Sequence, residues 1–244
     1  MEENRQPEIN TEMASEEVTE AVEAGKTAEK TSGGKKLLND ILDIVESTFA
    51  TVFVMIMVFT YLLHPVNVDG DSMNPTLHDK DRILMTTVYG KLEYGDIVIV
   101  NNDAVYGIDA DGDAVDMAVK NNQLDKCIIK RVIAAGGQTI NIDNSDSDRS
   151  KWTVEVDGKV IDEPYIAETA FTSKSGLFDG KFPFKVPEGY YFVMGDNRNN
   201  SSDSRSGYVG LIKKDQVYGK ALVRYNPLSD FKFLFNSHKE SAED

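Results

Sequence analysis

The sequence predicts a mostly β protein, in which an antiparallel β domain follows one transmembrane helix. Three observations carry this prediction. Residues 47–63 form an uncharged apolar run. Short apolar runs separated by turn residues follow it, and no helical pattern of convincing length interrupts them. The 244 residues suffice for one sizeable domain or two small ones.

The first 34 residues differ in composition from the rest of the chain. Between Glu2 and Lys30 there are nine Glu and only three Lys or Arg, with no aromatic residue. Such a segment buries too little apolar surface to offset its ordering entropy, so we expect residues 1–34 to be a disordered acidic tail. The alternative is a docking segment for a basic partner. The formal net charge of −15 argues against a nucleic-acid binder, which needs a basic face.

The apolar run is long enough to cross most of a bilayer. As a helix, residues 47–63 span about 25 Å, and apolar residues at helical spacing in 37–45 extend the run. We expect an anchor helix over residues 35–64, because the residue before Pro65 disfavours helix. A buried core helix and a cleavable signal peptide are the alternatives. The run is long for a signal peptide, starts far from Met1 and lacks a small-residue cleavage site after it.

The charges beside the anchor predict its orientation. Lys35 and Lys36 precede the apolar run, and the next Lys or Arg is Lys80. Cationic residues concentrate on the cytoplasmic side of membrane proteins. We therefore expect a single pass through the cytoplasmic membrane, with a cytoplasmic N-terminus and an extracytoplasmic domain.

Residues 65–228 form the expected β domain, and residues 229–244 the expected C-terminal tail. Asp157-Gly158 between two apolar runs is a strong hairpin signal. The expected strands are 82–85, 96–100, 128–134, 140–142, 152–156, 190–194 and 220–225.

The segment 101–125 is rich in aspartate and suggests a calcium loop. An EF-hand loop needs Gly at its sixth position and Glu at its twelfth. Here Gly112 is fourth from Asp109, and the segment contains no Glu. We expect a solvated loop, with weak divalent-ion binding as the alternative.

Cys127 is the only cysteine, so no internal disulfide can form. It lies in an apolar strand-like run without a partner motif. The sequence therefore predicts a buried structural thiol rather than a nucleophile.

Ser72 is the candidate nucleophile. It follows Leu63 by nine residues, which reach about 30 Å at full extension, so its chemistry takes place close to the bilayer surface. A serine hydroxyl needs a neighbouring base to take its proton. His78, six residues further on, would permit a Ser-His-Asp triad.

Lys130 is the better candidate base. Strict alternation in a strand places Lys130 and Arg131 on opposite faces, so one of the two cations points toward a less solvated side. An amine in apolar surroundings has a lowered pKa and can accept a proton. The alternative is a lysine at a sheet edge whose amine extends to water.

Three segments resemble a known family, the type I signal peptidases. Residues 72–77, Ser-Met-Asn-Pro-Thr-Leu, resemble the family's nucleophile segment, and residues 130–133, Lys-Arg-Val-Ile, are similar to its catalytic-lysine segment. Residues 195–205 are similar to its third signature almost residue for residue. The order, the spacing and the single anchor are most similar to the enzymes of Gram-positive bacteria. The resemblance covers residues 37–225.

The resemblance implies a role for each residue of the site. Ser72 is the nucleophile and Lys130 the general base of a Ser-Lys dyad. Ser201 would hydrogen-bond and orient the lysine, and the backbone N–H of Ser72 would donate to the oxyanion. The remaining residues are expected to support the dyad as an ion-pair network, namely Asp196, Arg198, Asp203 and Arg205, or to shape the strand and the substrate groove, namely Met73 and Pro75.

Two positions depart from the family pattern. Some members have a serine two residues before the nucleophile as a second oxyanion donor, a group worth about 3 kcal/mol, and here that position is Gly70. Members of the Gram-positive type also carry glycine there. Residues 134–138 read Ala-Ala-Gly-Gly-Gln, without the proline and acid usual in this turn. This departure concerns the turn geometry more than the chemistry.

The resemblance implies a membrane-anchored serine endopeptidase that cleaves signal peptides from exported preproteins after small residues, at Ala-x-Ala sites. It implies a smaller inserted β subdomain at about residues 141–187. The expected partners are signal peptides, the lipid bilayer and the protein export machinery, and no metal or cofactor is implied. The competing hypotheses are a self-cleaving Ser-Lys repressor with a related fold, a non-catalytic membrane-bound binding module and an anchored structural protein.

Overall fold

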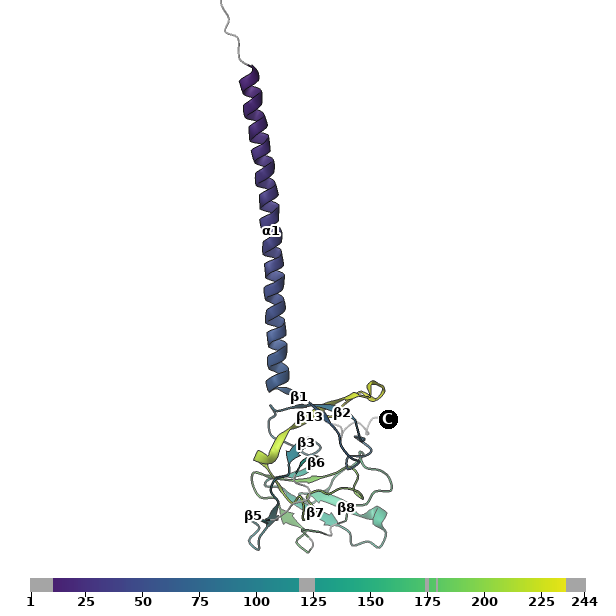
Figure 1. Cartoon of the computed structure of the whole chain (residues 1–244). Helices are drawn as coiled ribbons and strands as arrows, with labels where there is room; N and C mark the ends of the chain where they lie inside the picture. The colour runs from purple at the N-terminus through teal and green to yellow at the C-terminus, as the bar shows by residue number, and fades with distance from the viewer. Residues whose placement is uncertain (1–10, 119–125, 174–175, 179, 236–244) are drawn as a thin grey trace, which may run out of the picture. The chain divides into compact units, whose positions relative to one another are not determined.

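The computed structural model describes residues 11–118, 126–173, 176–178 and 180–235 (Figure 1). The chain divides into two compact units, Met1–Met57 and Val58–Asp244. The described residues of the first are helical, and the second contains all of the β structure that the described residues form.

The helix α1 (Thr11–Tyr61) contains the predicted anchor. Its part Lys36–Tyr61 has a mean hydropathy of 2.0 and is long and apolar enough to cross a membrane. The apolar side chains of this part are exposed, as expected of a surface that faces lipid rather than a protein core. The helix ends before the predicted boundary at residue 64, because the first strand already begins at Leu63.

The structure differs from the expected disordered tail in residues 11–34, which belong to α1. Residues 1–10 lie outside the described part. Residues 11–34 are rich in Ala, Glu and Lys, which have high intrinsic helix propensity, and they contain no proline. Local propensity therefore outweighs the lack of apolar surface that predicted disorder.

The main sheet is antiparallel and has the strand order β1-β2-β13-β3-β6-β11-β12, with β14 paired to β13. The strands expected at 82–85, 96–100, 128–134, 190–194 and 220–225 all lie in it. Its members are β1 (Leu63–Asn67), β2 (Arg82–Thr86), β3 (Ile97–Asn101), β6 (Cys127–Ala135), β11 (Tyr190–Met194), β12 (Ile212–Lys213), β13 (Val217–Asn226) and β14 (Lys232–Phe233).

The C-terminal part is more ordered than a tail. The short helices η2 (Lys214–Gln216) and η3 (Leu228–Asp230) flank β13. The strand β14 then pairs with β13 within the predicted tail 229–244. Residues 236–244 lie outside the described part.

A second antiparallel sheet, of strand order β10-β7-β8-β9, lies where the inserted subdomain was expected. The predicted hairpin at Asp157-Gly158 is confirmed, and both turn residues have positive φ, as a tight turn between twisted strands requires. The members are β7 (Thr139–Asp143), β8 (Thr153–Val156), β9 (Lys159–Val160) and β10 (Phe184–Lys185), with the short helix η1 (Arg149–Lys151) between β7 and β8.

The prediction of a solvated loop over residues 101–125 is wrong in part. The strands β4 (Tyr106–Ile108) and β5 (Ala114–Asp116) form an antiparallel hairpin there. Ile108 is buried in a core cluster, which gives the hairpin an apolar attachment. Residues 119–125 lie outside the described part. Among the described residues, no group of His, Cys, Asp or Glu is arranged to hold a metal ion.

The prediction of a buried thiol is also wrong, since Cys127 is exposed. It is the first residue of β6, and burial in this strand begins with Ile128. An apolar neighbourhood in sequence does not bury a residue at the open end of a strand.

The largest apolar cluster joins the two sheets. It packs Ile133 and Ala134 of β6 and Phe192 of β11 against the inserted sheet. Phe178 belongs to this cluster and is stacked on Phe184, with ring centroids 4.7 Å apart. The inserted sheet is therefore held on β6, the strand that carries Lys130.

We predict that Phe178→Ala lowers the free energy of unfolding by about 3–5 kcal/mol, because Phe178 is 1% exposed and its loss leaves a cavity between the sheets. Urea denaturation of the full chain in detergent measures this change. Leu228→Ala, at a side chain that is 81% exposed, is the control and is expected to change stability by less than about 0.5 kcal/mol. Equal effects of the two variants would contradict the assignment of this core.

Candidate active site

The structure brings Ser72 and Lys130 together. The Lys130 Nζ lies 2.8 Å from the Ser72 Oγ, across 58 positions of sequence. The same nitrogen donates a hydrogen bond to the carbonyl of Ile129, at 2.9 Å. A neutral amine has two N–H groups and one lone pair, so it can donate to this carbonyl while its lone pair accepts the serine proton.

Lys130 is shielded from water. Its side chain lies in β6, which pairs with β3, and the residue is only 3% exposed. Burial lowers the pKa of Lys130 from its ordinary value of 10.5 to about 8, against the opposing effect of the Asp203 and Asp196 carboxylates. Arg131 is also buried, so both neighbouring cations of β6 are shielded from water, although only one was expected to be.

The segment that carries Ser72 is fastened to the third motif. The backbone N–H of Asn197 donates to the carbonyl of Ser72 at 3.0 Å, and its side-chain amide donates to the carbonyl of Asp71 at 3.0 Å. Gly195 lies so close to the carbonyl of Ser72 that any side chain at position 195 would collide with this carbonyl and with Ser201. Glycine at position 195 therefore permits the close approach of the two segments.

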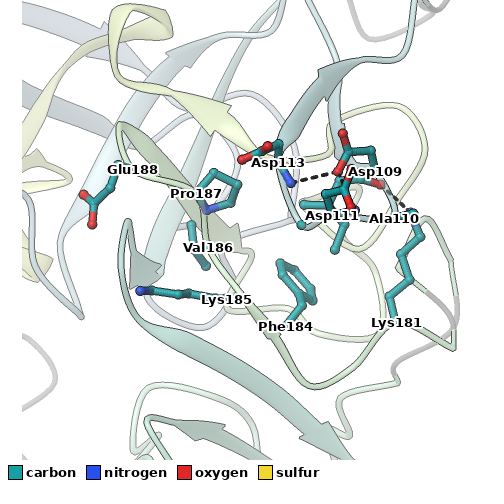
Figure 2. Close-up of a pocket in the computed structure, with 12 residues that line it drawn as sticks. Asp109, Ala110, Asp111, Asp113, Lys181, Phe184, Lys185, Val186, Pro187 and Glu188 are labelled. Carbon is teal, nitrogen blue, oxygen red and sulfur yellow. Dashed lines mark hydrogen bonds between the residues drawn. The ribbon is translucent and has the colours of Figure 1, made fainter.

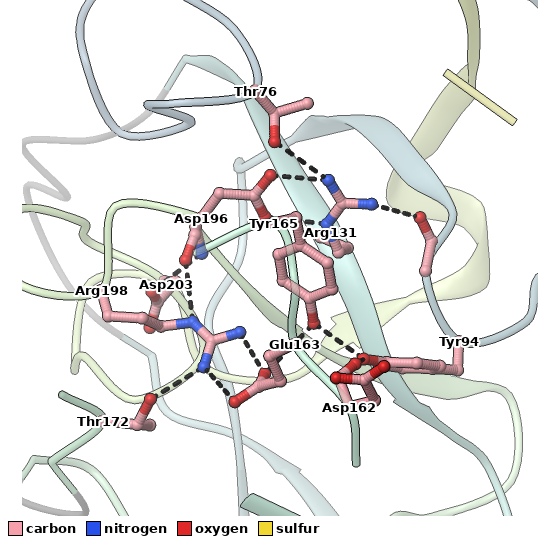
Figure 3. Close-up of polar contacts among 12 residues, drawn as sticks. Thr76, Tyr94, Arg131, Asp162, Glu163, Tyr165, Thr172, Asp196, Arg198 and Asp203 are labelled. Carbon is pink, nitrogen blue, oxygen red and sulfur yellow. Dashed lines mark hydrogen bonds and ion pairs between the residues drawn. The ribbon is translucent and has the colours of Figure 1, made fainter. Parts of the chain in front are cut away.

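The third motif is held by buried ion pairs (Figure 3). The guanidinium of Arg131 donates to both carboxylate oxygens of Asp196, at 2.8 and 2.6 Å. Arg205 donates to both oxygens of Asp203, at 2.8 Å each. Although burial alone would raise it, the hydrogen bonds and charge of Arg205 hold the pKa of Asp203 below its ordinary value. The two carboxylates thus form ion pairs with arginines and none with Lys130.

The expected network of four charged residues is therefore correct only in part. Asp203 pairs with Arg205, but Asp196 pairs with Arg131 and Arg198 pairs with Glu163. Arg198 Nη1 donates to Glu163 at 3.0 Å and to Thr172 at 2.8 Å. These partners were not among the residues predicted from the sequence. Arg131 had a signal, since it adjoins Lys130 in a buried strand, whereas Glu163 and Thr172 lie in a polar segment without a recognisable pattern.

The resemblance implies a hydrogen bond from Ser201 to Lys130, and the structure does not contain one among the described residues. The Oγ of Ser201 is buried and has no hydrogen-bond partner among the described residues. It lies against Gly195, beside the segment that carries Ser72.

A cavity of about 320 Å³ adjoins the Ser72–Lys130 pair. Met73 lines it, as expected for the substrate groove, and is itself 1% exposed. Pro75 does not line this cavity but lines another one, which borders the same nucleophile segment. Residues 66–73 form one wall, residues 126–130 the other, and Ile99, Asn200 and Ser202 complete the lining.

His78 is not placed as the base of a triad. Its side chain is exposed and lies 3.9 Å from Asp81, and it does not line the cavity that holds Ser72 and Lys130. The base that the structure places beside the nucleophile is the lysine.

A separate cavity of about 690 Å³ lies beside the β4–β5 hairpin (Figure 2). Asp109, Asp111, Asp113, Lys181 and Glu188 are among its lining residues. Lys181 donates to the carbonyl of Ile108 at 2.6 Å, and the lining contains no serine, cysteine or histidine. This cavity therefore contains no pair of nucleophile and base comparable to Ser72 and Lys130.

Comparison with known proteins agrees with this geometry. Residues 41–226 match the family model described as "Signal peptidase, peptidase S26". The chain is 33% identical to "Signal peptidase I S" of Bacillus subtilis over 79% of this chain and 92% of that protein. It is 34% identical to "Signal peptidase I" of Bacillus licheniformis over 84% of this chain and 98% of that protein, and 30% identical to "Signal peptidase IB" of Staphylococcus aureus over 81% and 95%.

The match covers most of this chain and nearly the full length of these relatives, and it includes all three motifs. The chain therefore belongs to the signal peptidase family, peptidase S26, as a serine endopeptidase of the Gram-positive-like type I kind that cleaves signal peptides.

Proposed function

We propose that this enzyme cleaves signal peptides with a Ser-Lys dyad, in which Ser72 is the nucleophile and Lys130 the general base. The observation that carries the proposal is the 2.8 Å separation of Lys130 Nζ and Ser72 Oγ inside a site where the lysine is 3% exposed. A lysine with a pKa of about 8 is uncharged often enough near neutral pH to act as a base.

The reaction proceeds through an acyl-enzyme. Lys130 takes the hydroxyl proton as Ser72 Oγ bonds to the substrate carbonyl carbon. The backbone N–H of Ser72 donates to the resulting oxyanion. The intermediate collapses when the peptide C–N bond breaks and Lys130 gives its proton to the leaving amine. A water molecule, deprotonated by Lys130, then attacks the ester, and the returning proton restores Ser72.

The substrate lies in the cavity beside the dyad as an added strand. Among the described residues, β11 pairs only with the Arg131–Ala135 part of β6, so the backbone of Cys127–Lys130 has no strand on that side. An extended peptide can pair with such an edge. The resemblance to the family supports cleavage after Ala-x-Ala sequences, and the cavity of about 320 Å³ has room for these side chains.

The enzyme works at the outer surface of the cytoplasmic membrane. The helical part Lys36–Tyr61 anchors it in the lipid bilayer, and Lys35 and Lys36 place its N-terminus in the cytoplasm. Preproteins emerging from the export machinery would meet the site there.

We predict that Ser72→Ala, Lys130→Ala and Lys130→Arg each lower preprotein cleavage by a factor on the order of 10⁴ or more, because each removes the nucleophile or the base. Arginine is instructive because it keeps the charge but cannot lose its proton. A gel assay with a purified preprotein in detergent measures cleavage. Lys159→Ala, at an exposed position on β9, is the matched control and retains full activity. Full activity of any dyad variant would refute the mechanism.

The second prediction concerns pH. The charged lysine cannot accept a proton, so activity is lost below its pKa and gained above it. With a pKa of about 8, about a tenth of Lys130 is neutral at pH 7 and about nine-tenths at pH 9. The kcat/KM should rise across this range with one ionisation. A limb near the ordinary histidine pKa of about 6.5 that vanishes in His78→Ala would favour the triad instead.

A further inference from the structure

A second cavity borders the nucleophile segment. It has a volume of about 300 Å³ and begins where the first cavity ends: residues 66–73 line the first, and Asn74, Pro75 and His78 line the second. The third motif borders both, with Asn200 and Ser202 in the first cavity. The other residues that line the second cavity are Ala167, Thr169, Ala170, Asp196, Asn197 and Asn199.

The wall that the third motif contributes is fastened to the nucleophile itself. Asn197 lines the second cavity and donates hydrogen bonds to the carbonyls of Ser72 and Asp71, each at 3.0 Å. Asp196 is held in place by Arg131, which follows Lys130 in β6. A peptide in this cavity would therefore contact Asn197, which is hydrogen-bonded to Ser72, and Asp196, which is paired with the residue that follows Lys130.

The opposite wall comes from the inserted subdomain and is anchored at both ends. Glu163 and Thr172 bind the guanidinium of Arg198, and the backbone N–H of Phe171 donates to the side-chain oxygen of Asn199 at 3.2 Å. Figure 3 shows Tyr165 between the guanidinium groups of Arg131 and Arg198.

Between these anchors, Ala167, Thr169 and Ala170 line the cavity. Their side chains are small, so the wall leaves space. The wall is thus held by buried contacts although its middle is a loop.

We propose that the second cavity binds the residues of the substrate that follow the cleaved bond and favours short polar ones. The inference rests on the proposed function: if the residues before the bond occupy the cavity with Lys130, the departing chain must continue beyond Ser72 in the other direction. The second cavity lies along that direction, past Asn74 and Pro75.

The lining explains the preference. Three amide side chains, one hydroxyl, the Asp196 carboxylate and the His78 imidazole line the cavity, and its apolar lining consists of two alanines and one proline. A peptide N–H or a short polar side chain can form hydrogen bonds with these polar groups, whereas a large apolar side chain would leave them unpaired.

Two synthetic peptides test the proposal. They share all residues up to an Ala-x-Ala cleavage site; the short one ends one residue after the bond, and the long one continues with several serines and glutamines. For the full-length enzyme in detergent, we expect kcat/KM to be about tenfold higher for the long peptide. Ala167→Trp fills the cavity and should lower this long-to-short ratio by about tenfold.

Glu168→Trp is the matched control, since Glu168 lies in the same turn, is exposed and does not line the cavity. Its ratio should stay within about twofold of the original. Ala170→Trp fills the cavity from a second position and should repeat the effect of Ala167→Trp. If neither Ala167→Trp nor Ala170→Trp changes the long-to-short ratio of kcat/KM, the inference is overturned while the proposed function stands. Failure of the unmodified enzyme to cleave either peptide overturns both.

Discussion

The proposed chemistry depends on one amine that must be uncharged while it touches a serine hydroxyl. Water would keep Lys130 protonated, and burial removes that water, which brings its pKa to about 8. The two nearest carboxylates, Asp196 and Asp203, work against this effect because a negative charge favours the ammonium form. Each of them is engaged by an arginine, so neither forms an ion pair with the lysine. The two arginines therefore occupy the carboxylates that would otherwise be available to form an ion pair with Lys130.

These buried ion pairs are better understood as positioning devices than as sources of stability. Removing two charges from water costs several kcal/mol for each ion, and their attraction only partly offsets this cost. What a bidentate pair supplies is a fixed geometry. Arg131 follows Lys130 in β6 and pairs with Asp196. The neighbours of Asp196, Gly195 and Asn197, lie against the carbonyl of Ser72. One strand therefore carries the base and also locates the segment that braces the nucleophile.

The inserted subdomain takes part in the same arrangement. Its sheet packs on β6 and β11 through an aromatic cluster, and its segment 163–172 reaches back to Arg198. The resemblance to the family indicated an insertion but no purpose for it. The contacts of Glu163, Tyr165 and Thr172 with Arg198 hold this segment, and its residues Ala167, Thr169 and Ala170 line a cavity beside the nucleophile segment.

The fold class, most strands of the main sheet and the apolar helix could be predicted from the residues, and the pairing of Ser72 with Lys130 from the resemblance of separate signatures to a known family. These features are local: strand runs, a hydropathic stretch and short signatures are each written in consecutive residues. The pairing of each arginine with its acid became evident only from the three-dimensional contacts. Any of several guanidinium groups could pair with Asp196 or Asp203, and distance in space, which sequence spacing does not encode, selects the partner. For the same reason the sequence did not reveal that Ser201 lacks the hydrogen bond implied by the family pattern, or that Cys127 is exposed at the open end of β6.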